Sequence, residues 1–168
     1  TPDTITWINK GFEMLDSLVE WCAENKMYVI LDMHGTPGGQ GTNADISDYN
    51  PNKPSLWESQ KNKDKLIALW VKLAERYSTN PWVAGYDLIN ETNWQFSEPD
   101  NKPLWNLFKE LTTAIRKVDT NHMIILEGNW FANDYTGLPQ IWDNNLVLSF
   151  HKYWTYNDDS SLDWMITL

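Results

Sequence analysis

Short β-rich apolar runs alternate with longer helical patterns along this chain, and that alternation restricts the fold more than any other feature. Four runs are typical of strands: 27–33, 83–91, 123–126 and 146–150. Apolar residues elsewhere recur every three or four positions, which predicts amphipathic helices over 5–25, 55–78 and 103–119. The second of these begins with Ser55 and Glu58 at capping-box spacing. Strands separated by helices form right-handed βαβ units, so the pattern predicts an α/β fold with a parallel sheet.

Two architectures satisfy this pattern: an open parallel α/β sheet and a piece of a (β/α)8 barrel. A complete barrel needs roughly 250 residues and eight strands, whereas this chain has 168 residues and four clear strands. A barrel interpretation therefore covers about half of a barrel. The run 27–33 is expected to be buried on both faces, as in parallel sheets, and a turn of helix is expected at 138–142.

Charge and composition narrow the class of partner. The net charge of −10, without a run of Lys or Arg, disfavours both nucleic acid and anionic membrane surfaces. The longest apolar runs are far shorter than the roughly 20 residues that a membrane-spanning helix needs. The 11 Trp residues exceed what one core of this size needs, and exposed indole rings form platforms for sugar rings. We therefore expect a neutral partner.

Every predicted strand ends in polar side chains. The four ends read Asp32-Met33-His34, Asn90-Glu91, Glu127-Gly128-Asn129-Trp130 and His151-Lys152-Tyr153. The carboxyl ends of parallel strands meet at one edge of the sheet, where functional groups of α/β proteins collect. Charged and imidazole side chains are normally rare in buried strands. Their repetition at four strand ends predicts a catalytic or binding site at this edge.

Several kinds of chemistry lack their motifs. The Gly-rich segment 35–41 matches neither a dinucleotide fingerprint nor a P-loop, and no serine lies in a GxSxG elbow. HExxH and CxxC are absent, so we expect no metal and no cofactor. Asn90-Glu91 at a strand end instead fits glycoside hydrolysis, in which a carboxylic acid protonates the leaving oxygen and an amide hydrogen-bonds the sugar 2-hydroxyl.

Three segments together resemble a known family. Residues 32–40, 85–91 and 149–153 are similar to the third-, fourth- and sixth-strand motifs of family 5 glycoside hydrolases, the cellulase family of retaining (β/α)8 enzymes. The resemblance implies that the chain covers roughly strands three to six of such a barrel. It also implies a β-glucan substrate, with cellulose-like β-1,4-glucan first and β-1,3-glucan or β-mannan as alternatives.

The resemblance assigns roles to individual residues. It makes Glu91 the general acid/base and Asn90 the contact to the sugar 2-hydroxyl. It implies that His34 binds a sugar hydroxyl. His151 and Tyr153 are expected to hold the region around the nucleophile.

Other parts of the family pattern are not found in this sequence. Family members carry an Arg after the second strand, the nucleophilic Glu after the seventh and usually a Trp after the eighth. We therefore expect residues 1–168 to be a partial catalytic domain, truncated at both ends, with the nucleophile outside the chain. Glu127 follows the fifth strand, a position that the family does not use as nucleophile.

Three further aromatic residues complete the expected site. Trp94, Trp130 and Trp154 follow strand ends and are expected to rim the cleft, where they would stack on sugar. The expected partners are a polysaccharide or oligosaccharide and the missing half of the barrel, in cis or from a second copy. The first residues show no signal peptide, although the family implies a secreted full-length protein. The competing hypothesis is a non-catalytic sugar-binding or inactive half-barrel.

Overall fold

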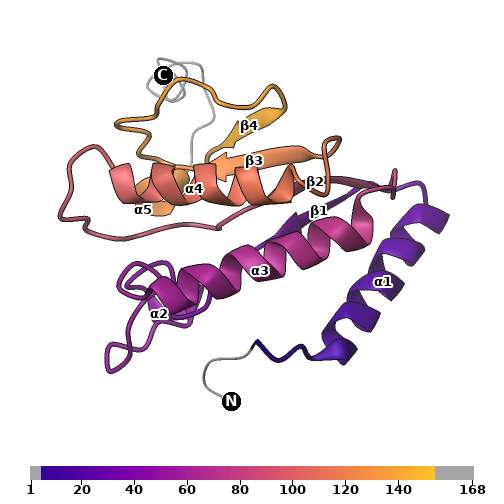
Figure 1. Ribbon diagram of the computed structural model, residues 1–168, viewed down its shortest axis with the longest axis horizontal. Helices are drawn as coiled ribbons and strands as arrows, with labels where there is room; N and C mark the ends of the chain where they lie inside the picture. The colour runs from indigo at the N-terminus through magenta and orange to yellow at the C-terminus, as the bar shows by residue number, and fades with distance from the viewer. Residues whose placement is uncertain (1–4, 154–168) are drawn as a thin grey trace.

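A computed structural model describes residues 5–153 of the chain. The elements follow in the order α1 (Asn9–Glu24), β1 (Val29–Asp32), α2 (Ala44–Ser47), α3 (Gln60–Tyr77), β2 (Val83–Asp87), α4 (Lys102–Ile115), β3 (Met123–Glu127), α5 (Asn129–Ala132) and β4 (Leu146–Ser149) (Figure 1). The strands form a sheet in the order β1-β2-β3-β4, and every neighbouring pair is parallel. This arrangement confirms the predicted α/β class and the parallel sheet.

Helices α3 and α4 lie side by side on one face of the sheet (Figure 1). Side chains of alternate strand residues, such as Tyr86, point into this layer and are buried. The indole of Trp70 on α3 packs on Tyr86 with 5.6 Å between ring centroids, and its Nε1–H donates to the carbonyl of Leu88 at 3.0 Å. The hydrophobic core therefore lies between the helices and this face.

The opposite face of the sheet is partly open. Ile30 on β1 is 52% exposed and Val147 on β4 is 39% exposed. The prediction that the first strand is buried on both faces is therefore wrong, because α3 and α4 cover the face of Leu31 and leave that of Ile30 to solvent. The same face carries Asp87 and Glu127 at the carboxyl ends of β2 and β3, where both side chains are buried.

Two local predictions also differ from the structure. The capping box forms, since Ser55 Oγ–H donates to Glu58 Oε2 at 2.8 Å, but α3 begins later, with Ser59 as the N-cap. No helix forms over 138–142, and the short segment α5 contains left-handed backbone at Trp130 and Phe131.

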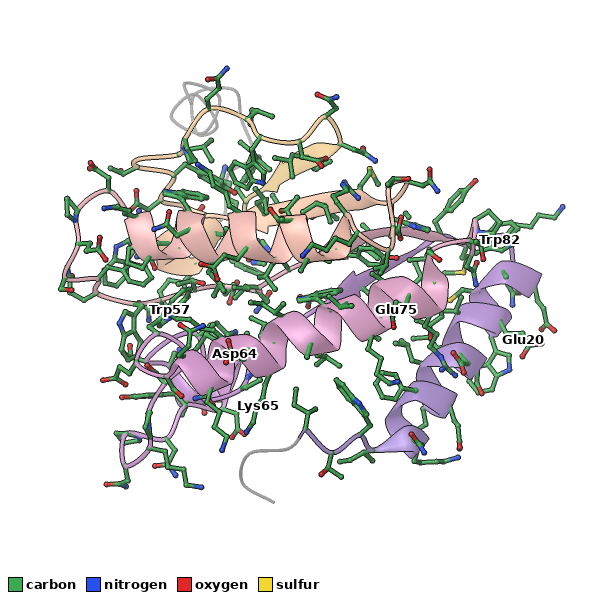
Figure 2. The ribbon with its side chains drawn as sticks, in the orientation of Figure 1. Glu20, Trp57, Asp64, Lys65, Glu75 and Trp82 are labelled. Carbon is green, nitrogen blue, oxygen red and sulfur yellow. The ribbon has the colours of Figure 1, made fainter. Side chains whose placement is uncertain are left out.

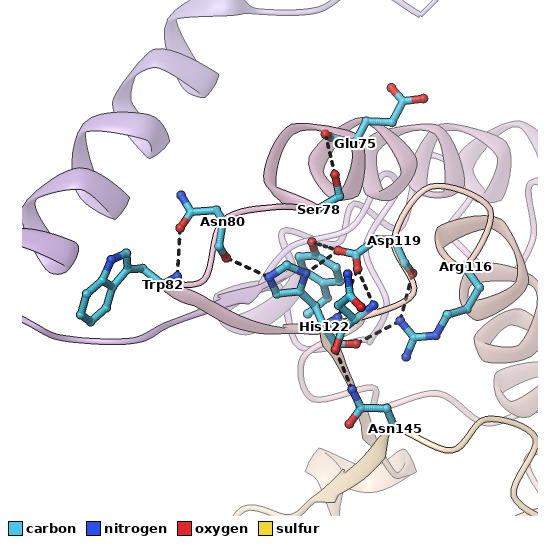
Figure 3. A network of polar contacts seen from close by, with 10 residues as sticks. Glu75, Ser78, Asn80, Trp82, Arg116, Asp119, His122 and Asn145 are labelled. Atoms are coloured by element: carbon cyan, nitrogen blue, oxygen red, sulfur yellow. Dashed lines mark hydrogen bonds and ion pairs between the residues drawn. The ribbon is translucent and has the colours of Figure 1, made fainter.

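The two ends of the strands differ in character. Figure 2 shows Trp82 near the amino end of β2, far from Trp57 at the other end of α3. At the amino end His122 is buried, with Nδ1 2.6 Å from Asp119 Oδ2 and Nε2 3.0 Å from the Asn80 carbonyl (Figure 3). As its position before β3 suggests, His122 belongs to a structural network. No helix within residues 5–153 is long and apolar enough to cross a membrane.

Candidate active site

Glu91 occupies the loop that follows β2, at the carboxyl end of the sheet. It is 9% exposed, and its backbone has a φ of 40°, a region that residues with a β-carbon rarely adopt. The Glu91 N–H donates to Glu127 Oε2 at 2.7 Å. This hydrogen bond connects the loop after β2 to the carboxyl end of β3.

His151, just beyond β4, lies between two carboxylates. Its Nδ1 is 2.6 Å from Glu91 Oε1, and its Nε2 is 3.0 Å from Glu127 Oε1. The sequence resemblance implies that His151 acts near the nucleophile. In the structure its ring contacts Glu91, the predicted acid/base. The three side chains come from three different strand ends and form one contact network.

Asn90 is buried beside Glu91, and its backbone is tied to the neighbouring strand end. Its N–H donates to the Met33 carbonyl at 3.2 Å, and its own carbonyl accepts from Gln40 Nε2 at 2.8 Å. The side-chain Nδ2 of Asn90 has no hydrogen-bond partner among the described residues. A buried amide donor without a partner is costly unless a ligand satisfies it.

Gln40 was not singled out from the sequence, although it lies within the first of the three motifs. Its side chain is fully buried and accepts from both the N–H and Oγ of Thr36, at 3.1 and 3.2 Å. It also donates to the His34 carbonyl at 3.0 Å. Gln40 therefore links the ends of β1 and β2 through its side chain. In the sequence, one polar residue in a Gly-rich loop is only a weak indication of such a role.

His34 is an exposed member of the predicted set. Its Nδ1 lies 2.9 Å from Asp32 Oδ2, at the end of β1. The structure therefore places His34 at the expected edge of the sheet, on the far side of β2 from His151.

Burial changes the ionisation of two further carboxyls. Burial, reinforced by the charge of Glu127, raises the pKa of Asp87 to about 8. Burial also raises the pKa of Glu127 to about 7, against the lowering effect of the Glu91 N–H. The side-chain Oδ1 of Asp87 has no hydrogen-bond partner among the described residues. Asp87 was not predicted as a site residue. The sequence feature that could have indicated it is a carboxylate within an otherwise apolar strand.

A pocket of about 450 Å³ contains the predicted acid/base. Its lining residues are Ile46, Glu91, Phe131, Asn133, His151 and Tyr153. Tyr153 is 84% exposed and stands edge-on to His151, with 6.1 Å between ring centroids. The apolar side chains of Ile46 and Phe131 were not predicted, because each lies in a short segment, α2 or α5, that has no hydrophobic period of its own.

Trp94 and Trp130 line a separate pocket of about 330 Å³. The Trp94 backbone is held by Asn129, whose Oδ1 accepts at 3.1 Å and whose Nδ2 donates at 2.8 Å. Trp154 lies outside the described residues. Within 5–153 no His, Cys, Asp and Glu side chains are grouped so that three could hold a metal ion.

Comparisons with known proteins agree with these strand-end motifs. The family model for cellulases, glycosyl hydrolase family 5, matches residues 2–165. A β-xylosidase from Phanerodontia chrysosporium is 35% identical over 147 residues, which cover 86% of this chain and 30% of that protein. Endoglucanase C from Acetivibrio thermocellus is 28% identical over 145 residues, with 85% and 39% covered.

Solved structures agree in fold. Endoglucanase Cel5A from Thermotoga maritima superposes with a TM-score of 0.66 at 18% identity, over 87% of this chain and 42% of that one. The chain thus spans less than half the length of each of these proteins. The parallel sheet is part of a (β/α)8 barrel, as one of the two architectures predicted. With the family model matched over almost its whole length, this chain belongs to the cellulase family, glycosyl hydrolase family 5.

Proposed function

We propose that this chain is the central part of a retaining glycoside hydrolase domain that cleaves β-glucan, with Glu91 as the general acid/base. The observation that carries the proposal is the pairing of Asn90 and Glu91 at the end of β2. Glu91 lines a pocket, and Asn90 holds a buried amide donor beside it without a partner among the described residues. An acid that protonates the leaving oxygen and a donor to the sugar 2-hydroxyl are two of the groups that retaining glycoside hydrolysis uses.

The mechanism is a double displacement. Glu91 gives its proton to the glycosidic oxygen as the bond from the anomeric carbon to that oxygen breaks. A second carboxylate, roughly 5–5.5 Å away, forms a covalent glycosyl-enzyme. Glu91, now ionised, then takes a proton from the water that releases the sugar. We assign that second carboxylate to a Glu outside these 168 residues.

The neighbouring side chains have supporting roles in this proposal. Asn90 donates to the sugar 2-hydroxyl, and His34 binds another hydroxyl. His151 and Tyr153 border the cleavage point, while Trp94 and Trp130 offer aromatic surface for further sugar rings. Trp154, outside the described residues, is proposed to stack on a sugar ring as well.

The proposed substrate is cellulose-like β-1,4-glucan, cleaved internally. The name of the similar endoglucanase C supports this choice, and that of the β-xylosidase supports a β-linked glycoside more generally. β-1,3-glucan and β-mannan are the alternatives. A polysaccharide substrate of this size also supports a secreted full-length protein, with the rest of the barrel as the partner in cis.

Glu91→Gln in the full-length protein tests the proposal. Gln cannot supply a proton, so we expect kcat/KM on cellotetraose to fall by on the order of 100- to 10,000-fold. Dinitrophenyl cellobioside needs no proton on its leaving group, so its kcat/KM should fall far less. Equal losses on the two substrates would refute the assignment of Glu91.

A second candidate function is sugar binding without hydrolysis. The pocket that contains Trp94 and Trp130 favours it, because it offers aromatic surface without Glu91. Calorimetric binding of cellotetraose by a full-length protein that releases no reducing sugar would support this alternative.

A further inference from the structure

Glu127 makes more contacts around the proposed acid/base than any assigned role explains. Its Oε2 accepts the Glu91 N–H at 2.7 Å, and its Oε1 lies 3.0 Å from His151 Nε2. The other ring nitrogen of His151 lies 2.6 Å from Glu91 Oε1. Glu127 therefore reaches Glu91 by two routes, one through the backbone and one through the imidazole ring.

The backbone route concerns the conformation of Glu91. A positive φ is unfavourable for a residue with a β-carbon and persists only where surrounding contacts impose it. The hydrogen bond from the Glu91 N–H to Glu127 is such a contact. It fixes the direction in which the Glu91 side chain leaves the backbone.

The imidazole route concerns the carboxyl group of Glu91. A carboxylate in contact with one nitrogen of a histidine orients the ring and determines what the other nitrogen presents. Here that other nitrogen faces Glu91 Oε1. Because Glu127 is only 1% exposed, water does not compete for its contacts.

We propose that Glu127 is a positioning residue that holds Glu91 in the geometry for proton transfer, through the Glu91 peptide N–H and through His151. This inference rests on the proposed role of Glu91. It gives Glu127 a function other than nucleophile, since both of its oxygens are already engaged with Glu91 and His151. The titratable groups that face Glu127 are Asp32, Asp87, Glu91, Tyr135 and His151.

The test is Glu127→Gln in the full-length protein. Its kcat/KM is measured on two substrates, with rates normalised to the concentration of folded protein. Misplacement of a reacting group by about 1 Å can cost on the order of 100-fold in rate. We therefore expect a loss of about 100-fold on cellotetraose and a much smaller loss on dinitrophenyl cellobioside, whose leaving group needs no acid. Glu127→Asp, which keeps the charge but shortens the side chain, should show the same selectivity.

A double-mutant cycle separates positioning from a general loss of structure. If Glu127 acts through Glu91, adding Glu127→Gln to Glu91→Gln should change kcat/KM on cellotetraose by less than about twofold. Asp119→Asn is the matched control, because Asp119 is a buried carboxylate that also contacts a histidine, at the amino end of the strands (Figure 3). It should lower stability and leave the ratio of the two kcat/KM values unchanged.

The outcomes distinguish the two proposals. If Glu91→Gln discriminates between the substrates and both Glu127 variants do not, the positioning role is wrong and the role of Glu91 stands. If the effects of Glu127→Gln and Glu91→Gln multiply in full, Glu127 acts independently and the inference is also wrong. If Glu91→Gln itself does not discriminate, the proposed function is wrong and the inference falls with it.

Discussion

Glu91 depends on residues that are remote in the sequence. Its peptide N–H binds Glu127, its carboxyl group contacts His151, and the preceding Asn90 is braced by Gln40. The same concentration of buried polar groups raises the pKa of Asp87 and of Glu127. The site is therefore assembled at a cost in stability, and that cost depends on pH.

Asp87 should make the protein less stable as pH rises. Burial raises its pKa from 3.8 to about 8, so the folded protein keeps a proton that the unfolded chain loses near pH 4. This contribution to stability is fully present below about pH 4 and is lost as pH rises through about 8. Glu127, with its pKa raised to about 7, acts in the same direction.

We expect Asp87→Asn to flatten this dependence, because the amide does not ionise. The free energy of unfolding of Asp87→Asn minus that of the wild type should increase by more than about 1 kcal/mol between pH 4 and pH 8. Urea unfolding of the full-length protein across this range measures the effect. The exposed Asp45→Asn serves as the control and should leave the pH slope unchanged. A wild-type stability that rises between pH 4 and 8, with no change in slope in Asp87→Asn, would contradict the argument.

Helix α3 carries much of the packing against the sheet, and its start depends on a single cap. Ser59 Oγ accepts from the Asn62 N–H at 3.3 Å, while the capping box of Ser55 and Glu58 stabilises the turn before the helix. From this start the helix presents Trp70 to Tyr86 and to the strand end that carries Glu91. The hydrogen bonds at the amino terminus of α3 thus help to set how this helix packs against the sheet.

Ser59→Ala should therefore lower the free energy of unfolding by about 1 kcal/mol, the usual cost of losing an N-cap side chain. Denaturant unfolding of the full-length protein gives the value. Ser78→Ala, at the other end of α3, is the matched control, since Ser78 Oγ makes only a long, exposed contact to the Glu75 carbonyl at 3.4 Å. If the two variants were equally destabilised, the cap would not be the cause.

The described sheet has two outer strands, β1 and β4, each paired on one side. Unpaired strand edges offer N–H and C=O groups to other chains, and exposed apolar side chains add to this tendency. Here Ile30 is 52% exposed on β1, and Phe150, just after β4, is 46% exposed. In a closed barrel further strands would cover both edges.

We expect the 168 residues expressed alone to aggregate or to pair edge to edge, and not to hydrolyse β-glucan. The proposed nucleophile lies outside this sequence, so Glu91 has no partner carboxylate for a double displacement. Sedimentation and the release of reducing sugar from soluble cellulose measure both outcomes. A compact monomer that hydrolyses the substrate would show that Glu127 or another carboxylate of this chain serves as nucleophile.

The sequence alone was sufficient for the class of the fold and for the edge of the sheet that carries the polar residues. Helix and strand periods are local, so they predicted α1, α3, α4 and all four strands to within a few residues, and each strand end could be read directly. Three motifs in order also predicted the family, which the family model confirms. Errors occurred where local spacing was ambiguous, as at 138–142 and at the start of α3.

Only the tertiary structure decided which of these residues touch. Glu91 meets Glu127 across 36 positions and His151 across 60 positions of sequence, and no local pattern contains such pairings. The exposure of Ile30 and the raised pKa of Asp87 likewise depend on which elements cover each face of the sheet. Burial and electrostatic interaction are set by neighbours in space, whereas hydrophobic periodicity records only neighbours along the chain.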